Sequence, residues 1–507
     1  MRHQRSAVVF ALSVLMFGCE GRPIDRGFPS GPNPPASPPA LAFRVGDIGT
    51  EVLVDMVVDP SGGIYLTGTF SGTTDFDPGT GVAARTSLGS TDVFVAKYSG
   101  GAFVWVAQIG GTGSERVTSL ARDAAGNLYL GGAFEGSTDF DPGAGGQVLT
   151  SLGGEDGFVV KLSAVGDFMW TRRLGGTSAD QVTGVAVDAT GRTYATGVFS
   201  GSADLLPAVG PTIVSTGAQD AFLLGLDAAG AVGFFFPIGG IDTDRANAVA
   251  VTSGGVVVIG GTFRGSAAFD PGSSTVTQLT SQGGDDIFLA GYATDGTFLW
   301  ARGLGGIAEE EIRAGGLAPD TEGGVVATGT FTGTTDFDAG TGEASRTSLG
   351  GTDWFAVRYD GTGIFRSVFA VGSVAADPAP RPAADPDGSL LVTGGFSGAV
   401  DFDPGSGGTV IASLGSAGAT DAFVAKYTFA GGLTWVSRFG EGTSVAERQN
   451  RGVAVAPFSS GGVVTAGQFF GSPDFDPGAP AFRLTSLGSA DIFVVLLTST
   501  GALSLTP

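Results

Sequence analysis

The sequence predicts an all-β protein: a single seven-bladed β-propeller with four-stranded antiparallel blades of about 65 residues. Three observations predict it. A unit of this length recurs seven times, each unit contains four short β-rich runs joined by glycine turns, and no helical periodicity interrupts them. Four-stranded sheets repeated radially form propellers, whose ring leaves few open sheet edges.

The clearest marker of the unit is an Asp-x-Phe tripeptide, which places an acid at the start of a β-rich run. The seven copies begin at Asp92, Asp156, Asp220, Asp286, Asp353, Asp421 and Asp491. The copies follow one another without a linker, so the whole repeat array is expected to be one domain.

The second copy shows the four runs in order. Strands are expected at 105–109, 117–121, 127–130 and around 158–162. Asp123–Gly126 has the Asp and Gly positions of a β-turn, and a second turn is expected at Gly166. The Asp-Phe-Asp-Pro-Gly segment 139–143 lies between the last two strands and accounts for the length of the unit.

The two ends of the array are expected to complete one blade. Leu41 and Leu505 both align with the position that holds Trp in four copies, at Trp105, Trp170, Trp300 and Trp435. Strand material from both termini would close the ring without open edges. We expect the Trp side chains to pack between blades; a platform for a sugar or cofactor is the alternative. Lys97, Lys161 and Lys426 share another repeat position, expected to be a solvated strand position.

Composition excludes several classes of function. The formal net charge of −23 disfavours nucleic acid, which requires a basic face. The one cysteine and one histidine, Cys19 and His3, lie at the N-terminus, so the repeat array has no disulfide, no Cys or His metal site and no Ser-His or Cys-His nucleophile pair. Any catalysis would use carboxylates, Tyr, Lys or Arg.

The N-terminus predicts export. Arg2 and Arg5 precede an apolar run at 7–17, which is typical of a secretory signal and too short to span a bilayer. The sequence Met16-Phe17-Gly18-Cys19 resembles the lipobox of bacterial lipoproteins, which implies that Cys19 is lipidated. An ordinary signal peptide with an incidental cysteine is the alternative.

Three regions are therefore predicted: a lipoprotein signal peptide at 1–18, a Pro/Gly/Ser-rich tether at 19–40 and the propeller at 41–507. The resemblance, with Glu20 after the cysteine, implies the bacterial cell envelope and an outer-membrane lipoprotein. The membrane would then be contacted through the lipid anchor only.

The units also resemble the bacterial propeller unit known as the SBBP repeat. The resemblance covers 41–507 and rests on Gly175-Gly176, 185–188 with Gly191, Thr196–Phe199, and the Asp-x-Phe segments 92–98 and 421–427. It implies an extracytoplasmic scaffold and no particular reaction.

Paired acids recur in the Asp-Phe-Asp segments, and calcium is one interpretation of them. The pairs are Asp75 and Asp77, Asp139 and Asp141, Asp336 and Asp338, Asp401 and Asp403, and Asp474 and Asp476. Asp-x-Asp-x-Gly resembles the start of a Ca²⁺ loop, so Ca²⁺ is the one candidate cofactor. The alternative is that these acids cap turns through backbone hydrogen bonds.

A third set of acids follows the glycine or glycine pair at the end of each unit, where the chain enters the innermost strand of the next blade. The set consists of Glu51, Glu115, Asp180, Asp244, Glu310, Asp377 and Glu447. These acids are expected to form a ring at the channel mouth and are the predicted ligand-binding site. The alternative is a structural role in strand capping between blades.

Two functions remain open. The first is a non-enzymatic envelope scaffold that binds an envelope or extracellular protein or glycan. The second is an extracytoplasmic carbohydrate-active enzyme that uses paired carboxylates. An active site should break the repeat, and the longest departures are 308–316, 373–384 and 441–452, none of which has a catalytic pattern.

Overall fold

The computed structural model describes residues 42–47, 49–206, 212–270, 277–405, 408–415, 418–442, 449–458, 461–476, 478 and 481–504. The chain divides into two units, Met1–Pro38 and Pro39–Pro507, and all described residues belong to the second. Within these ranges the regular structure consists entirely of β-strands. No helix of the described residues is long and apolar enough to cross a membrane.

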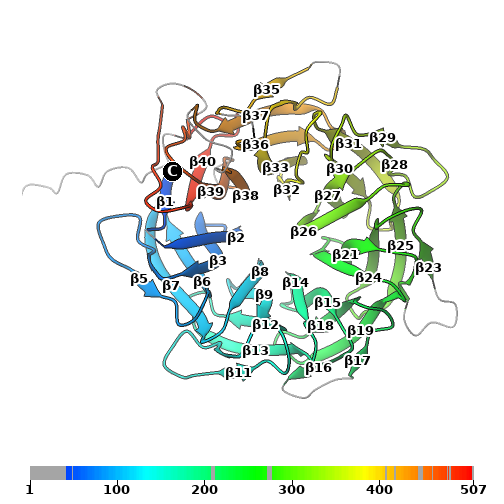
Figure 1. Cartoon of the computed structure of the whole chain (residues 1–507), viewed down its shortest axis with the longest axis horizontal. Helices are drawn as coiled ribbons and strands as arrows, with labels where there is room; N and C mark the ends of the chain where they lie inside the picture. The colour runs from blue at the N-terminus through cyan, green and yellow to red at the C-terminus, as the bar shows by residue number, and fades with distance from the viewer. Residues whose placement is uncertain are drawn as a thin grey trace, which may run out of the picture. The chain divides into compact units, whose positions relative to one another are not determined.

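The second unit is a seven-bladed propeller, which confirms the predicted fold class (Figure 1). The innermost strands of blades one to seven are β2 (Thr50–Val58), β8 (Glu115–Arg122), β14 (Gln181–Val187), β20 (Arg245–Val251), β26 (Glu310–Pro319), β32 (Arg381–Ala384) and β38 (Arg451–Pro457). The second strands are β3 (Gly63–Ser71), β9 (Leu128–Phe134), β15 (Thr193–Phe199), β21 (Val256–Phe263), β27 (Val325–Phe331), β33 (Ser389–Phe396) and β39 (Val463–Phe469).

The outer two strands of each blade continue the antiparallel order. The third strands all begin at the Asp of Asp-x-Phe: β6 (Asp92–Ser99), β12 (Asp156–Leu162), β18 (Asp220–Leu226), β24 (Asp286–Ala293), β30 (Asp353–Tyr359), β36 (Asp421–Thr428) and β40 (Asp491–Leu497). The outermost strands are β7 (Ala102–Gly111), β13 (Phe168–Gly175), β19 (Val232–Gly240), β25 (Phe298–Leu304), β31 (Phe365–Val371), β37 (Leu433–Phe439) and β1 (Ala42–Val45).

A small side hairpin leaves each of the first six blades between its second and third strands. These hairpins are β4 (Thr73–Asp75) with β5 (Ala84–Thr86), β10 (Ser137–Asp139) with β11 (Val148–Thr150), β16 (Ser202–Leu206) with β17 (Ile213–Val214), β22 (Ser266–Ala268) with β23 (Gln278–Thr280), β28 (Thr334–Asp336) with β29 (Ser345–Thr347), and β34 (Ala399–Asp401) with β35 (Val410–Ala412).

The side hairpins join neighbouring blades. In blade two, β10 pairs with the outermost strand of blade one, with Thr138 opposite Gly111 and Asp139 opposite Gly110. β16 and β22 pair with the preceding blades in the same way. The Asp-Phe-Asp segment therefore takes part in the strand pairing that links neighbouring blades.

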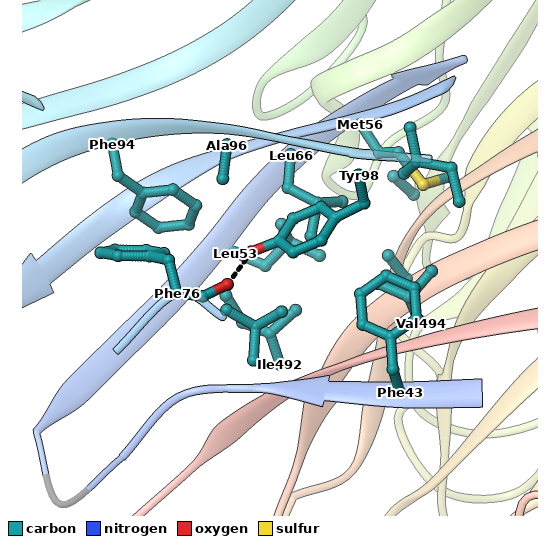
Figure 2. Close-up of a cluster of buried hydrophobic side chains, with 14 of the residues drawn as sticks. Phe43, Leu53, Met56, Leu66, Phe76, Phe94, Ala96, Tyr98, Ile492 and Val494 are labelled. Atoms are coloured by element: carbon teal, nitrogen blue, oxygen red, sulfur yellow. Dashed lines mark hydrogen bonds between the residues drawn. The ribbon is translucent and has the colours of Figure 1, made fainter. Parts of the chain in front are cut away.

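The two ends of the array meet in blade seven, as the repeat predicts. β1 pairs with β40 in the register Ala42 to Val495 through Val45 to Ile492, and Leu503 forms a bridge with Leu497 of the same strand. Figure 2 shows Phe43 of β1 beside Tyr98 of blade one, and their ring centroids are 5.0 Å apart. Leu41 and Leu505, from which closure was predicted, lie outside the described residues.

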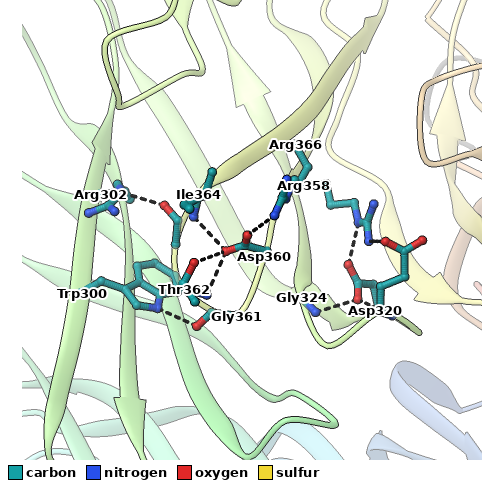
Figure 3. A network of polar contacts seen from close by, with 12 residues as sticks. Trp300, Arg302, Asp320, Gly324, Arg358, Asp360, Gly361, Thr362, Ile364 and Arg366 are labelled. Carbon is teal, nitrogen blue, oxygen red and sulfur yellow. Dashed lines mark hydrogen bonds and ion pairs between the residues drawn. The ribbon is translucent and has the colours of Figure 1, made fainter.

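The recurring tryptophans pack between blades, as expected. The Trp300 indole donates to the Gly361 backbone oxygen in the next blade at 3.1 Å, and the Arg302 Nε donates to the Gly363 oxygen at 2.7 Å (Figure 3). Gly363 has φ +75°, and a Cβ there would lie 2.5 Å from the Trp300 ring. The same contact joins Trp105 to Gly166, Trp170 to Gly230 and Trp435 to Gly501.

The expectation for the lysine position is corrected, because two of its lysines are buried. Lys161 and Lys426 have relative exposures of 4% and 6%. Lys426 Nζ lies 2.8 Å from a carboxylate oxygen of Asp385 in the turn between the first two strands of its blade. A buried ammonium requires such a partner, and a lysine pattern alone does not reveal it.

Ring closure should make a large contribution to stability. Phe43→Ala should lower the free energy of unfolding by about 3–5 kcal/mol, since it removes a buried ring at the junction of blades seven and one. Denaturant unfolding measures the change. Leu88→Ala is the control, because Leu88 is 66% exposed. An equally small effect of both changes would contradict the role of β1.

Candidate functional site

The acid of Asp-x-Phe is buried in all seven copies and caps the turn that precedes its strand. Asp156, for example, accepts a hydrogen bond from the Leu152 amide at 3.1 Å and one from the Arg173 guanidinium at 2.8 Å. Its relative exposure is 0%. These acids hold the start of the third strand and are closed to solvent.

Six of the predicted ring acids are buried at the blade interfaces, where each of the six lies next to the Asp-x-Phe acid of the preceding blade. Glu115 accepts hydrogen bonds from the Thr138 hydroxyl at 2.6 Å and from the Gly111 amide at 3.2 Å. Burial, and to a smaller extent the charge of Asp92 in blade one, raise the pKa of Glu115. Exposures of 0–1% are found for Glu51, Glu115, Asp180, Asp244, Glu310 and Asp377. This burial favours the structural alternative, strand capping between blades, over a ligand-binding ring.

Blade seven differs from the other blades at the ring position. Glu447 lies outside the described residues. The backbone amide of Asn450 donates to the backbone oxygen of Thr420, the residue before Asp-x-Phe in blade six. The backbone amide of Glu115 makes the equivalent bond to Thr91, the residue before Asp-x-Phe in blade one. Asn450 therefore occupies the ring position of blade seven, and its side-chain oxygen accepts the Phe470 amide at 2.9 Å.

Burial raises the pKa of at least one acid at each of these interfaces. The pKa of Glu51 and that of Glu115 rise to about 7, mainly through loss of water. Similar burial raises the pKa to about 6 for Asp156, Asp244, Asp286, Asp377 and Asp421. Two carboxylates that share a dry site favour the state in which one of them holds a proton.

The junction of blades seven and one shows why a proton is favoured. Among the described atoms, Glu51 Oε2 and Asp491 Oδ1 have no hydrogen-bond partner. A Cβ on Gly46 would lie 2.8 Å from the first and 3.0 Å from the second, so both oxygens border the same small space. A proton on one acid removes the repulsion between them.

Stability should consequently fall as pH rises. The folded Glu115 holds a proton that the unfolded chain releases between pH 4.5 and about 7, so its contribution is fully present below pH 4.5 and lost through pH 7. Glu115→Gln should therefore raise Tm more at pH 8 than at pH 5. Calorimetry at both values measures it, with the exposed Glu343→Gln as a charge-matched control. Equal shifts in the two variants would contradict this assignment.

The acids proposed for calcium cap a loop. In the side hairpin of blade two, Asp139 Oδ1 accepts the Asp141 amide at 3.0 Å and the Gln147 amide at 2.6 Å, while Asp141 Oδ1 accepts the Gly143 amide at 2.8 Å. The same bonds recur in the pairs that begin at Asp75, Asp336, Asp401 and Asp474. The described residues contain no group of three or more acidic, His or Cys side chains that could hold a metal. The geometry therefore favours the turn-capping alternative.

Asp139→Ala should lower the free energy of unfolding by about 1–3 kcal/mol, because two backbone amides lose their acceptor. Denaturant unfolding measures this, with the exposed Asp167→Ala as control. Chelator followed by excess Ca²⁺ should leave the wild-type Tm unchanged. A rise that is specific to Ca²⁺ and absent in Asp139→Ala would instead support the calcium prediction.

The innermost strands have a regular bulge that blade five breaks. One residue is unpaired in five blades, at Val54, Thr118, Thr183, Asn247 and Val453. Thr118 and Thr183 donate from this position to backbone oxygens of the next blade at 2.8 and 2.6 Å. In β26 four residues, 313–316, lie opposite the single Thr328. An enlarged bulge redirects the strand and the side chains that it carries.

The three segments that depart from the repeat meet at one cavity on the inner side of the ring. This cavity of about 460 Å³, here called the arginine pocket, is lined by Arg313 of blade five, Arg381 of blade six, Arg451 of blade seven and Val54 of blade one. Its volume lies within the usual range for small-molecule sites. A further cavity of about 550 Å³ lies at the regular turns of blades three to five and contains no departure from the repeat.

Sequence reasoning identified the three departures and missed their convergence. Arg313, Arg381 and Arg451 come from segments that were judged to lack a catalytic pattern. A signal was present, since each of the three departures contains an arginine near the start of an innermost strand. Distances between blades decide whether such residues meet, and the linear pattern does not contain them.

Comparison with known proteins finds only distant relatives. No protein-family model matches the chain. An uncharacterised WD repeat-containing protein of Acanthamoeba polyphaga mimivirus is 24% identical over 46% of this chain and 19% of its own length. The regulatory protein FlaEY of Caulobacter vibrioides is 26% identical over 52% of this chain and 27% of its own length. The matches thus span about a quarter or less of these relatives.

Solved structures give only distant likenesses. The WD40 domain of Neurospora crassa Pan2 is 10% identical, with a TM-score of 0.31 over 75% of this chain and 89% of that domain. A rhamnogalacturonan lyase of Bacillus licheniformis is 12% identical, with a TM-score of 0.24 over 92% of this chain and 77% of that chain. At these scores neither likeness supports an argument about function. The chain is a seven-bladed propeller, and its function has to be inferred from its own site.

Proposed function

We propose that this protein is a lipid-anchored propeller of the bacterial envelope that binds its ligand without converting it. The observation that carries the proposal is the arginine pocket, where the three irregular segments of an otherwise regular array converge. Repeated residues serve every blade alike, so a feature built from the irregular segments has a separate role. A protein or glycan of the envelope is the proposed partner class.

The burial of the paired carboxylates disfavours the alternative function, a carbohydrate-active enzyme. Glycoside chemistry requires two carboxyl groups that reach the substrate. The acid pairs at the blade junctions are buried; Asp92 and Glu115, for example, both have 0% exposure. They also recur around the ring with the same partners, as a structural element does. The lining of the arginine pocket, as far as it is described, contains no Asp or Glu.

The location in the envelope rests on the sequence. Cys19 follows an apolar run and a glycine, as in a lipobox, and the tether 19–40 would separate the anchor from the propeller. These residues lie outside the described part of the chain. The resemblance of the repeats to SBBP units supports the same extracytoplasmic location.

The binding function can be tested by filling the pocket. Ala314→Trp adds an indole at the pocket wall, and Val82→Trp places the same group at a site that is 81% exposed. An array of envelope glycans and peptides is probed with both variants and the wild type. We expect Ala314→Trp alone to lose the bound ligand, and mass spectrometry to recover that ligand intact. Equal binding by Ala314→Trp, or conversion of the ligand, would refute the proposal.

The anchor has its own test. Cys19→Ser should move the protein from the membrane fraction to the soluble fraction, because acyl chains contribute about 0.8 kcal/mol per buried methylene. Mass spectrometry of the wild-type protein should identify an acylated N-terminal Cys19 peptide. Equal membrane association of the two proteins would show that the cysteine is not the anchor.

A further inference from the structure

The described lining of the arginine pocket contains basic residues and no acidic ones, whereas the protein as a whole is acidic. The chain contains 49 acidic residues and 26 Lys and Arg. Three arginines nevertheless line this one cavity, and its described lining contains no carboxylate. Such a local reversal of charge concentrates anions at the pocket while the remaining surface repels them.

Two of the arginines are held in place by uncharged partners. Arg451 donates from Nε and Nη2 to the Gln468 side-chain oxygen at 3.2 and 2.7 Å. Arg381 donates to the Val54 backbone oxygen at 3.4 Å. Its guanidinium lies over Gly315, where φ is +72° and a Cβ would be 1.4 Å from Nη1. The bulge of blade five therefore makes room for an arginine from blade six.

Among the described residues, the acids near the pocket leave part of this positive charge unpaired. Arg313 pairs with Glu311 at 3.0 Å, and both side chains of that pair are about half exposed. Burial raises the pKa of Asp55, and the nearby charge of Arg381 opposes this rise. The Asp55 carboxylate oxygens accept the Met56 and Leu120 backbone amides at 2.9 Å each. Burial and the neighbouring charge of Arg381 lower the pKa of Arg451. The two arginines thus repel each other across the pocket.

We propose that the arginine pocket binds a small ligand that carries carboxylate or phosphate groups, held by Arg313, Arg381 and Arg451. This inference rests on the proposed binding function and specifies that the ligand is an anion. The planar guanidinium fork matches both types of oxyanion, with two parallel N–H donors for each. Occupation of the pocket relieves the repulsion between Arg381 and Arg451.

The size of the pocket restricts the class of ligand. A volume of about 460 Å³ accommodates a small molecule or the acidic terminal group of a larger one. The net charge of −23 opposes the approach of a long polyanion such as a nucleic acid.

The test uses ligands of known charge. Succinate, inorganic phosphate and methyl glucuronoside are titrated into the wild-type protein by calorimetry, with methyl glucoside as the neutral analogue. We expect at least one anion to bind, the neutral sugar not to bind, and the affinity to fall as salt is added. Succinate and methyl glucuronoside test for recognition of a carboxylate group, and inorganic phosphate tests for recognition of a phosphate group.

Matched variants locate the site. Arg313→Gln and Arg451→Gln should each weaken anion binding by about tenfold or more, since a charge-assisted contact is lost. Arg264→Gln removes the same charge from an exposed ion pair with Asp285 and should leave binding unchanged. Circular dichroism confirms that each variant is folded, and Arg313 is the safest position because it is 56% exposed.

The outcomes distinguish the two proposals. If no anion binds the wild type, or the arginine variants bind as well as Arg264→Gln, the charge assignment is overturned. If Ala314→Trp abolishes binding of an array ligand while both arginine variants retain it, the binding function stands and anion recognition fails. Loss in Ala314→Trp and in both arginine variants supports both proposals.

Discussion

The junction between adjacent blades is the constraint on which the rest of the structure depends. Between blades one and two, Gly110 passes so close to Asp92 that a Cβ would lie 2.0 Å from its carboxylate. Gly111 has equally little space, with a Cβ 2.1 Å from the Ser137 backbone oxygen, and its amide donates to Glu115. A glycine pair therefore lets two backbones and two acids share one dry space, and the pair recurs at 175–176, 239–240 and 305–306.

This junction changes the meaning of the acidic composition. Many of the recurring acids are structural: they accept backbone amides and cap turns, and burial at the interfaces raises the pKa of several of them. A buried carboxyl group is tolerated because its hydrogen bonds are made and its charge is reduced by protonation. The net charge calculated from the sequence thus overstates the charge of the folded protein at mildly acidic pH.

Regularity and function are separated in this molecule. Asp, Gly, Phe and Trp at fixed positions pack each blade against the next, so these positions cannot vary to form a binding site. Freedom exists where the repeat is broken, in the enlarged bulge 313–316, the short strand β32 and the start of β38. Because these segments belong to consecutive blades, the ring brings them to one wall of the central space (Figure 1). A binding site can form there without disturbing the junctions.

The sequence by itself determined the number of blades, the four strands of each blade, the role of both termini in closing the ring and the packing role of Trp300 and its equivalents. These follow from local periodicity, which a repeated chain records seven times. Tertiary structure alone decided that Glu115 meets Asp92, that Asn450 occupies the ring position of blade seven, and that Lys426 is buried beside Asp385. It also decided that Arg313, Arg381 and Arg451 share a cavity. The physical reason is that burial and charge coupling depend on distances between blades, whereas the sequence pattern encodes only the order of residues within them.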